Sequence, residues 1–114
     1  MTGLRIALAG LLALVVFGGL AAADQAGDKT LLDNDRVLVM EVVFPPGFKG
    51  DEHEAPVDEF AYVLEGQFTV VTKGKGKTVV RKGQVEWAPR GAIHYSLNET
   101  TRPARVLVVL LKER

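Results

Sequence analysis

The chain of 114 residues has no cysteine and only two histidines, His53 and His94. Without cysteine it can carry neither structural disulfides nor a lipid anchor on a processed N-terminal cysteine. It also lacks a serine-histidine-aspartate arrangement and a glycine loop of the kind that cradles phosphate. Its stability must therefore come from its core, helped by a partner subunit, and any chemistry that needs an imidazole is confined to two positions.

An excess of charge of one sign is missing as well. The 14 basic and 14 acidic side chains cancel to a formal net charge of zero. If the N-terminal segment with Arg5 is removed, 13 basic side chains remain against 14 acidic ones, and the charge becomes −1. Such a chain attracts neither nucleic acid nor an anionic bilayer. We therefore expect no nucleic-acid partner.

The first 23 residues have the pattern of an export signal. Arg5 precedes an uncharged run over residues 6–23, and the run ends in three alanines that suit cleavage after Ala23. A retained membrane anchor is the alternative, because 18 uncharged residues just reach the length of a spanning helix. Gly18-Gly19 weakens such a helix and favours cleavage. The sequence predicts an exported protein, periplasmic or secreted, with no stable membrane anchor after cleavage.

Helical periodicity is absent beyond this segment, and Gly or Pro stands at nearly every junction between apolar runs. Residues 24–35 are polar with a turn signal at 33–35, and we assign them to an arm leading into a single domain over residues 36–114. Strands are predicted over residues 36–44, a short stretch ending near 53, 59–64, 67–72, 77–81, 84–88, 92–98 and 104–111. This pattern predicts an all-β sandwich or barrel.

Apolar residues bear on packing and assembly. Residues 106–111 are apolar without the alternation of a strand that has one wet face, so we expect one face inside the barrel and the other against a second subunit, in a homodimer. Phe60 and Tyr62 should point away from Glu59, either between sheet layers or into that interface. Trp87 is expected in the core.

A run of alternating lysine and glycine, residues 73–77, is interpreted as a solvated hairpin. Its glycines allow positive φ, and its lysines protect the sheet edge from pairing with other chains. An anion-binding loop is the weaker interpretation. Arg81-Lys82 continues the same basic patch, so a role near an acidic partner stays open.

The spacing of glycine, histidine and glutamate resembles the two motifs of the cupin superfamily. The first reads Gly, five residues, His-x-His, three or four residues, Glu, six residues, Gly, and its positions are Gly47, His53, Ala55, Glu59 and Gly66. The second reads Gly, five residues, Pro-x-Gly, two residues, His, three residues, Asn, and is met by Gly83, Pro89, Gly91, His94 and Asn98. The resemblance spans residues 36–111 and implies a small double-stranded β-helix, or jelly-roll, barrel.

The matched positions imply a metal site formed by His53, Glu59 and His94. In one straight strand His53 and Glu59 would lie roughly 20 Å apart, too far to share an ion with bonds of about 2 Å. Pro56 breaks strand pairing, so a reversal over residues 55–58 can bring them together. Two imidazoles and a carboxylate serve iron, manganese, zinc, nickel or copper, and in non-haem iron sites they leave coordination positions open.

Ala55 stands where the cupin motif usually has a second histidine. A methyl group cannot bind metal, so its presence either weakens the site or opens one more position to water or substrate. Asp51, two residues before His53, could substitute as an oxygen ligand. Ser96 and Asn98 share the face of His94 and could supply hydrogen bonds, and Asn98 is also expected to tie down backbone nearby.

Two functions of different classes fit this site. The first is an exported cupin that binds one divalent metal and a small molecule in the barrel. If it is an enzyme, an iron-dependent oxygenase is favoured over an isomerase, because oxygen and substrate both need free positions. The second is a metal-free binding or sensing module whose pocket is lined by Ala55, Ala61, Val63 and Trp87. Both histidines fall on motif positions, which favours the first, and no catalytic residue is assigned.

Overall fold

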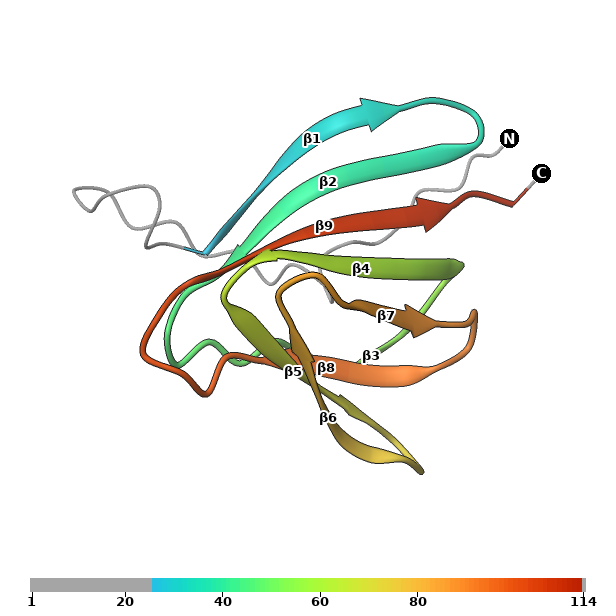
Figure 1. Ribbon diagram of the computed structural model, residues 1–114. Coiled ribbons are helices and arrows are strands. Elements are labelled where there is room, and N and C mark those ends of the chain that lie inside the picture. Colours follow the sequence, from blue (N-terminus) through green and yellow to red (C-terminus); the bar gives the residue numbers. More distant parts are fainter. Residues whose placement is uncertain (1–25, 114) are drawn as a thin grey trace.

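The computed structural model describes residues 26–113, which form nine β-strands and no helix (Figure 1). The strands are β1 Gly27–Asp33, β2 Val37–Phe44, β3 His53–Glu54, β4 Asp58–Glu65, β5 Gln67–Thr72, β6 Gly76–Arg81, β7 Val85–Ala88, β8 Ile93–Leu97 and β9 Ala104–Leu111. The predicted all-β class is confirmed, and the eight predicted strands correspond to β2 to β9.

The export signal predicted at residues 1–23, with cleavage after Ala23, lies outside the described residues. Within the described range, no helix has the length and apolar character needed to cross a membrane.

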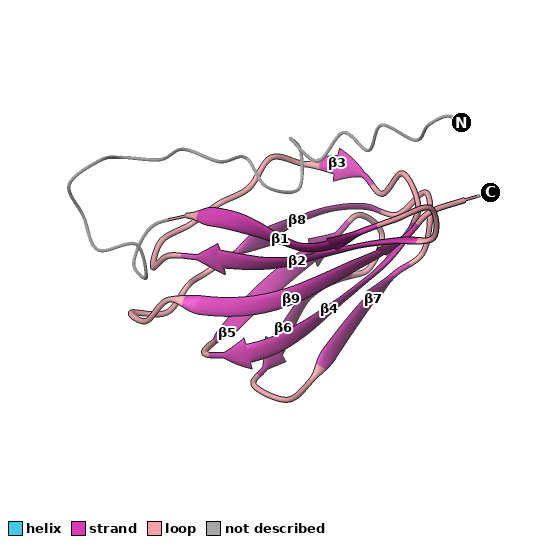
Figure 2. Cartoon of the chain, turned by 90° about the horizontal axis from the view of Figure 1, so that it is seen from above, coloured by secondary structure: helices cyan, strands magenta, loops and turns pink. Residues whose placement is uncertain are grey.

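Two antiparallel sheets build a double-stranded β-helix (Figures 1 and 2). The larger sheet has the strand order β1-β2-β9-β4-β7, and the smaller has the order β3-β8-β5-β6. The last strand, β9, lies between β2 and β4, so the C-terminal end of the chain is central to the larger sheet. At the other side, the edge strands β7 and β6 belong to different sheets and do not pair with each other.

The core follows from the alternation in β2 and β9. Alternate residues from Leu38 to Phe44 are buried, as are alternate residues from Ala104 to Leu110. The register pairs Leu38 with Leu110 and Phe44 with Ala104, so both sets face the barrel interior. Each buried Leu or Val side chain contributes roughly 1.5–3 kcal/mol. These inner rows therefore form the core side of the larger sheet, in which β9 pairs with β4, the strand that carries Glu59.

Strand β1 occupies the segment that the sequence analysis assigned to an arm. It pairs with β2 along its length, with a bulge between Thr30 and Leu32. Six of its seven residues are exposed, so no hydrophobic period marks it and the backbone ladder holds it in place. The predicted turn is present, because Asn34 Oδ1 accepts hydrogen bonds from the backbone N–H groups of Arg36 and Val37.

The outer face of the larger sheet carries a continuous apolar row. The register aligns one residue from each of its five strands, namely Leu32, Val39, Val109, Phe60 and Trp87. Phe60 and Trp87 contact each other with ring centroids 4.8 Å apart. Phe60 points away from the site, as predicted. The expectation that Trp87 lies in the core is wrong, because β7 is an edge strand and Trp87 on its outer side is 48% exposed.

Candidate metal centre

The chain reverses direction after His53, as predicted from Pro56. Strand β3 ends at Glu54, a bend follows at residues 56–57, and β4 begins at Asp58. The backbone of Ala55 fixes this bend: its N–H donates to the carbonyl of Ala92 at 2.7 Å, and its carbonyl accepts from the N–H of Gly91 at 2.8 Å. Gly91 has φ of 92°, a left-handed conformation that glycine adopts without strain. The turn before β8 therefore holds the end of β3 in place.

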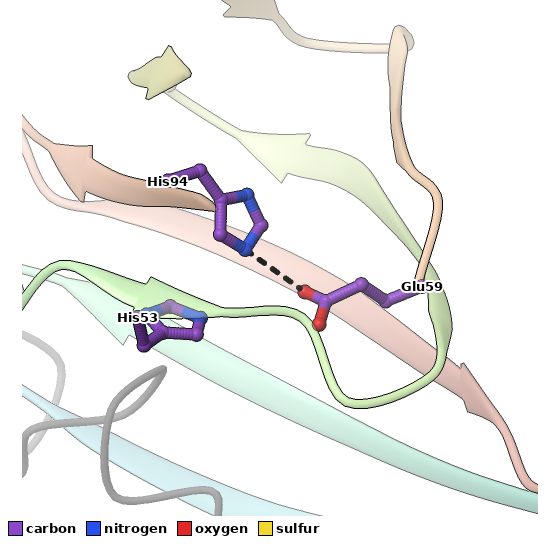
Figure 3. Close-up of side chains that lie close together, drawn as sticks. All are labelled: His53, Glu59 and His94. Atoms are coloured by element: carbon purple, nitrogen blue, oxygen red, sulfur yellow. Dashed lines mark ion pairs between the residues drawn. The ribbon is translucent and has the colours of Figure 1, made fainter. Parts of the chain in front are cut away.

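The two histidines come from one sheet and the glutamate from the other. His53 on β3 and His94 on β8 are direct cross-strand partners, with ring centroids 4.6 Å apart. Glu59 on β4 lies opposite Ala88 and Leu110 and is buried. The three side chains converge inside the barrel (Figure 3). The structure thus brings together the three residues that the motifs singled out.

The spacing of the donor atoms suits a single ion. One ligand atom from each of His53, Glu59 and His94 lies within 4.8 Å of the others. His94 Nε2 and Glu59 Oε1 are 3.8 Å apart, beyond hydrogen-bond distance (Figure 3). An ion with bonds of about 2.1 Å keeps its ligands within about 4.2 Å of one another. A small inward movement of the side chains would therefore complete the coordination.

A backbone hydrogen bond sets the tautomer of His53. Its Nδ1 lies 3.0 Å from the carbonyl oxygen of Asp51, which can only accept a hydrogen bond. The proton therefore resides on Nδ1, and Nε2 keeps its lone pair free to bind a metal. The carboxylate of Asp51 is exposed and stands outside the three-residue group, so the idea that it supplies an oxygen ligand is not supported. Asp51 acts here through its backbone.

Unpartnered polar atoms are concentrated at this site. In the described part of the chain, the buried side-chain nitrogens and oxygens without a hydrogen bond are His53 Nε2, Glu59 Oε2, His94 Nδ1 and His94 Nε2. A buried polar group left without a partner costs about 1–3 kcal/mol. Because all four atoms belong to one cluster of metal-ligand residue types, the donor set fits a divalent cation.

Burial pushes the two most enclosed groups toward their neutral forms. It lowers the pKa of His94 to about 4, with the nearby His53 adding to the effect. It raises the pKa of Glu59 to about 7, with Glu86 as the second cause. His94 and Glu59 therefore do not form an ion pair at neutral pH despite their proximity. Neutral imidazole is the form that binds metal, whereas Glu59 must release its proton to do so.

Asn98 holds backbone together, as predicted. Its Nδ2 donates to the carbonyls of Phe44 and Arg102, both at 2.8 Å, and its Oδ1 accepts from the N–H and hydroxyl of Thr100. None of these side-chain hydrogen bonds involves His53 or His94. Ser96 is buried and lines a small cavity beside Glu59 and His94. Of these two residues, Ser96 is the one placed to contact a molecule near the metal ligands.

Glu86 on β7 is a site residue that the sequence analysis missed. It lies opposite Ala61 on β4 and borders the same small cavity as Glu59 and His94. Burial raises its pKa to about 7. Side chains alternate along β7, so Glu86 and Trp87 must lie on opposite faces of the strand. The sequence gives this alternation but does not tell which of the two faces is the inner one.

The fold and the site together define a double-stranded β-helix barrel with a candidate metal centre in its interior. A family model described as "Cupin domain" matches residues 40–110, which is more than half of the chain. The chain therefore belongs to the cupin domain family. A comparison with curated protein sequences found no match.

Solved structures show the same likeness. TT1209 from Thermus thermophilus is 26% identical with a TM-score of 0.68, and the match covers 77% of this chain and 85% of that one. An RmlC-like cupin family protein from Methanocaldococcus jannaschii is 15% identical with a TM-score of 0.74, covering 86% and 90%. DMSP lyase DddQ from Ruegeria pomeroyi DSS-3 is 22% identical with a TM-score of 0.71, covering 82% and 51%. These similarities support the fold and specify no reaction.

Proposed function

We propose that the protein binds one divalent metal ion through His53, Glu59 and His94 and presents it to a small molecule inside the barrel. The observation that carries this proposal is the cluster of four buried, unpartnered donor atoms on these three residues. The free lone pair of His53 Nε2 and the neutral state of His94 add support, because both are the forms that a metal ion requires.

Iron, manganese, zinc and nickel all suit two imidazoles and a carboxylate. When bound, iron supplies oxygenase chemistry, and zinc or manganese supplies Lewis-acid chemistry. Among reactions we favour an iron-dependent oxygenase, because Ala55 provides no ligand and leaves one more coordination position free for oxygen or substrate. The chain's own contribution is to hold the ligands in place, to exclude water through Phe44, Phe68 and Val108, and to offer the hydroxyl of Ser96 to a bound molecule.

Export and dimer formation complete the proposal. The pattern of residues 1–23 supports export to the periplasm or the medium, with cleavage after Ala23. The apolar row across the outer face of the larger sheet supports a homodimer, because it crosses all five strands on the face opposite the core and its end residues Leu32 and Trp87 are exposed. Val109, in the centre of that row, is half-buried already in one subunit.

The metal content of protein purified without a histidine tag tests the main proposal. We expect about one metal per chain by elemental analysis, lost in His53→Ala and in His94→Ala. The matched control is Glu54→Gln, since Glu54 neighbours His53 on β3 but is exposed and should leave the metal in place. Circular dichroism would establish that the variants are folded.

A metal-free result would support a different function. If neither the purified protein nor protein incubated with iron, manganese, zinc or nickel holds an ion, the site is degenerate. The observation in favour of this alternative is Ala55, which is buried and removes one ligand of the usual set. The barrel would then bind or sense a small molecule without metal, and His94→Ala would change ligand affinity alone.

A further inference from the structure

In strand β7 the large apolar side chains face outward and the polar residue Glu86 faces inward, which is the reverse of an ordinary barrel strand. Val85 is 55% exposed on the outer side, whereas Glu86 lies on the inner side. In the described part of the chain no ion pair includes Glu86. A partly buried carboxylate without an ionic partner is costly. Packing alone therefore gives no reason for a glutamate at this position.

Glu86 stands between two cavities of very different size. An open cleft of about 900 Å³ follows the seam where β7 and β6, the edges of the two sheets, do not pair. A cavity of about 10 Å³ lies beside Glu59 and His94. Glu86 is the one residue of the described chain that lines both. Glu86 therefore separates the open cleft from the small cavity beside Glu59 and His94.

The two cavities differ in the size of the molecule that they can hold. Ligand sites in proteins commonly measure about 300–1,000 Å³, so the cleft can hold the body of a small molecule. The inner cavity has room for roughly one water molecule. Only a small group of a molecule bound in the cleft could enter the cavity beside Glu59 and His94, and on the way from the cleft it would pass Glu86.

The lining of the cleft indicates the chemistry of its ligand. Its inner walls include the apolar side chains of Val70, Val80 and Ile93, and Lys73 and Lys75 lie at its rim. The N–H of Lys73 donates to the carbonyl of Ile93 at 2.8 Å, which holds this end of the hairpin against β8. Glu86 is the only carboxylate in the lining. The cleft therefore has an apolar body, a basic rim and one acidic group at its inner end.

We propose that the cleft binds a small organic anion with an apolar body and that Glu86 is the residue that contacts its inner end and controls passage to the small cavity beside Glu59 and His94. The anionic group of the ligand lies near Lys73 and Lys75. A hydroxyl or another hydrogen-bond donor of the ligand meets the carboxylate of Glu86. This inference rests on the proposed function for what lies beyond Glu86, but not for the cleft itself.

Thiol labelling of metal-free protein tests the position of Glu86, because the chain has no cysteine of its own. Three variants are compared: Glu86→Cys, the exposed control Glu54→Cys, and Ser96→Cys, which lines only the inner cavity. With methanethiosulfonate reagents, we expect Glu86→Cys to react within about tenfold of Glu54→Cys and Ser96→Cys to react about a hundredfold more slowly. A Glu86→Cys thiol as slow as Ser96→Cys would overturn the proposal.

The ligand class is tested with reagents of opposite charge. The anionic ethylsulfonate reagent should label Glu86→Cys about tenfold faster than the cationic trimethylammonium reagent, because the rim lysines attract anions. Replacing Lys73 and Lys75 by Ala should abolish this preference. A preference for the cationic reagent, or one that survives loss of both lysines, would refute an anionic ligand.

Removal of the Glu86 side chain tests whether it controls passage from the cleft to the inner cavity. Adding Glu86→Ala to Ser96→Cys should speed labelling of the inner thiol by about tenfold, whereas adding Glu54→Ala should leave it unchanged. An unchanged rate in the Glu86→Ala background would show that Glu86 does not close the path. None of these reactions involves metal, so failure of metal binding and failure of this inference would be seen separately.

Discussion

His53 and His94 face each other as a cross-strand pair of β3 and β8, with their ring centroids 4.6 Å apart. The proximity matters for both side chains, because each would repel a proton on the other. Together with burial, it keeps His94 neutral at physiological pH. The pair therefore supplies two of the three residues of the candidate metal centre, and Glu59 comes from the opposite sheet.

A histidine at position 55 should strengthen metal binding. Ala55 is buried and occupies the position that usually carries a ligand in the cupin motif. We expect Ala55→His to raise the metal affinity by about tenfold or more, while overpacking lowers the stability of the metal-free protein by about 1–3 kcal/mol. Competition with a chelator gives the affinity, and urea unfolding gives the stability. A weaker metal affinity in a folded Ala55→His variant would contradict the assignment of the site.

The stability of the metal-free protein should fall as the pH rises from about 4.5 to 7. The pKa values of Glu59 and Glu86 are raised to about 7 from 4.5, so in this window the native state retains protons that the unfolded state has released. His94, with its pKa lowered to about 4 from 6.5, has the opposite effect below pH 6.5. Two carboxyl groups outweigh one imidazole, and the net loss is of order 2 kcal/mol.

Urea unfolding at pH 5, 6 and 7, chosen to span roughly that window, measures this effect. The decrease in the free energy of unfolding between about pH 5 and 7 should be smaller in Glu86→Gln, because the glutamine side chain does not titrate. Bound metal should reverse the trend, because Glu59 must lose its proton to bind. A stability that increases steadily with pH in the absence of metal would contradict the assignment.

Asn98 should be among the most sensitive polar residues. It is 1% exposed, and its side chain joins the end of β2 to the loop before β9. Asn98→Ala removes the donor to the buried carbonyl of Phe44 and leaves the carbonyl of Arg102 with the hydroxyl of Thr100 alone, at a cost of about 1–3 kcal/mol in the free energy of unfolding. Thr100→Val, which removes one hydroxyl at the same junction, should cost less. Equal effects of the two substitutions would mean that the loop, and not the amide of Asn98, holds the junction.

The outer apolar row should mediate dimer formation. Val109 lies at its centre, between Val39 and Phe60. Val109→Asp should raise the dimer dissociation constant by about a hundredfold or more, because it places a charge in a desolvated contact. Val79→Asp, on β6 of the other sheet, is the control. Sedimentation at micromolar concentration distinguishes the species, and a wild-type protein that sediments as a monomer would refute the interface.

Strands could be predicted from the sequence wherever alternate residues are buried, because apolar residues then recur at every second position. In β2 and β9 the alternation and the Gly and Pro residues at their ends are local features, and the predicted strands agree with the structure there. Strand β1 escaped prediction because six of its seven residues are exposed, so its sequence lacks the alternation of apolar residues that burial produces.

The all-β class and the reversal at Pro56 could be inferred from the sequence, because turn chemistry and the spacing of apolar runs are local properties, and the resemblance to the cupin motifs implied the three residues of the candidate metal centre. The folded arrangement was needed to see that the carbonyl of Asp51 selects the tautomer of His53, that Trp87 faces outward, and that Glu86 lies between the cleft and the small cavity beside Glu59 and His94. These facts depend on strand register and sheet edges, which follow from how distant segments pack together.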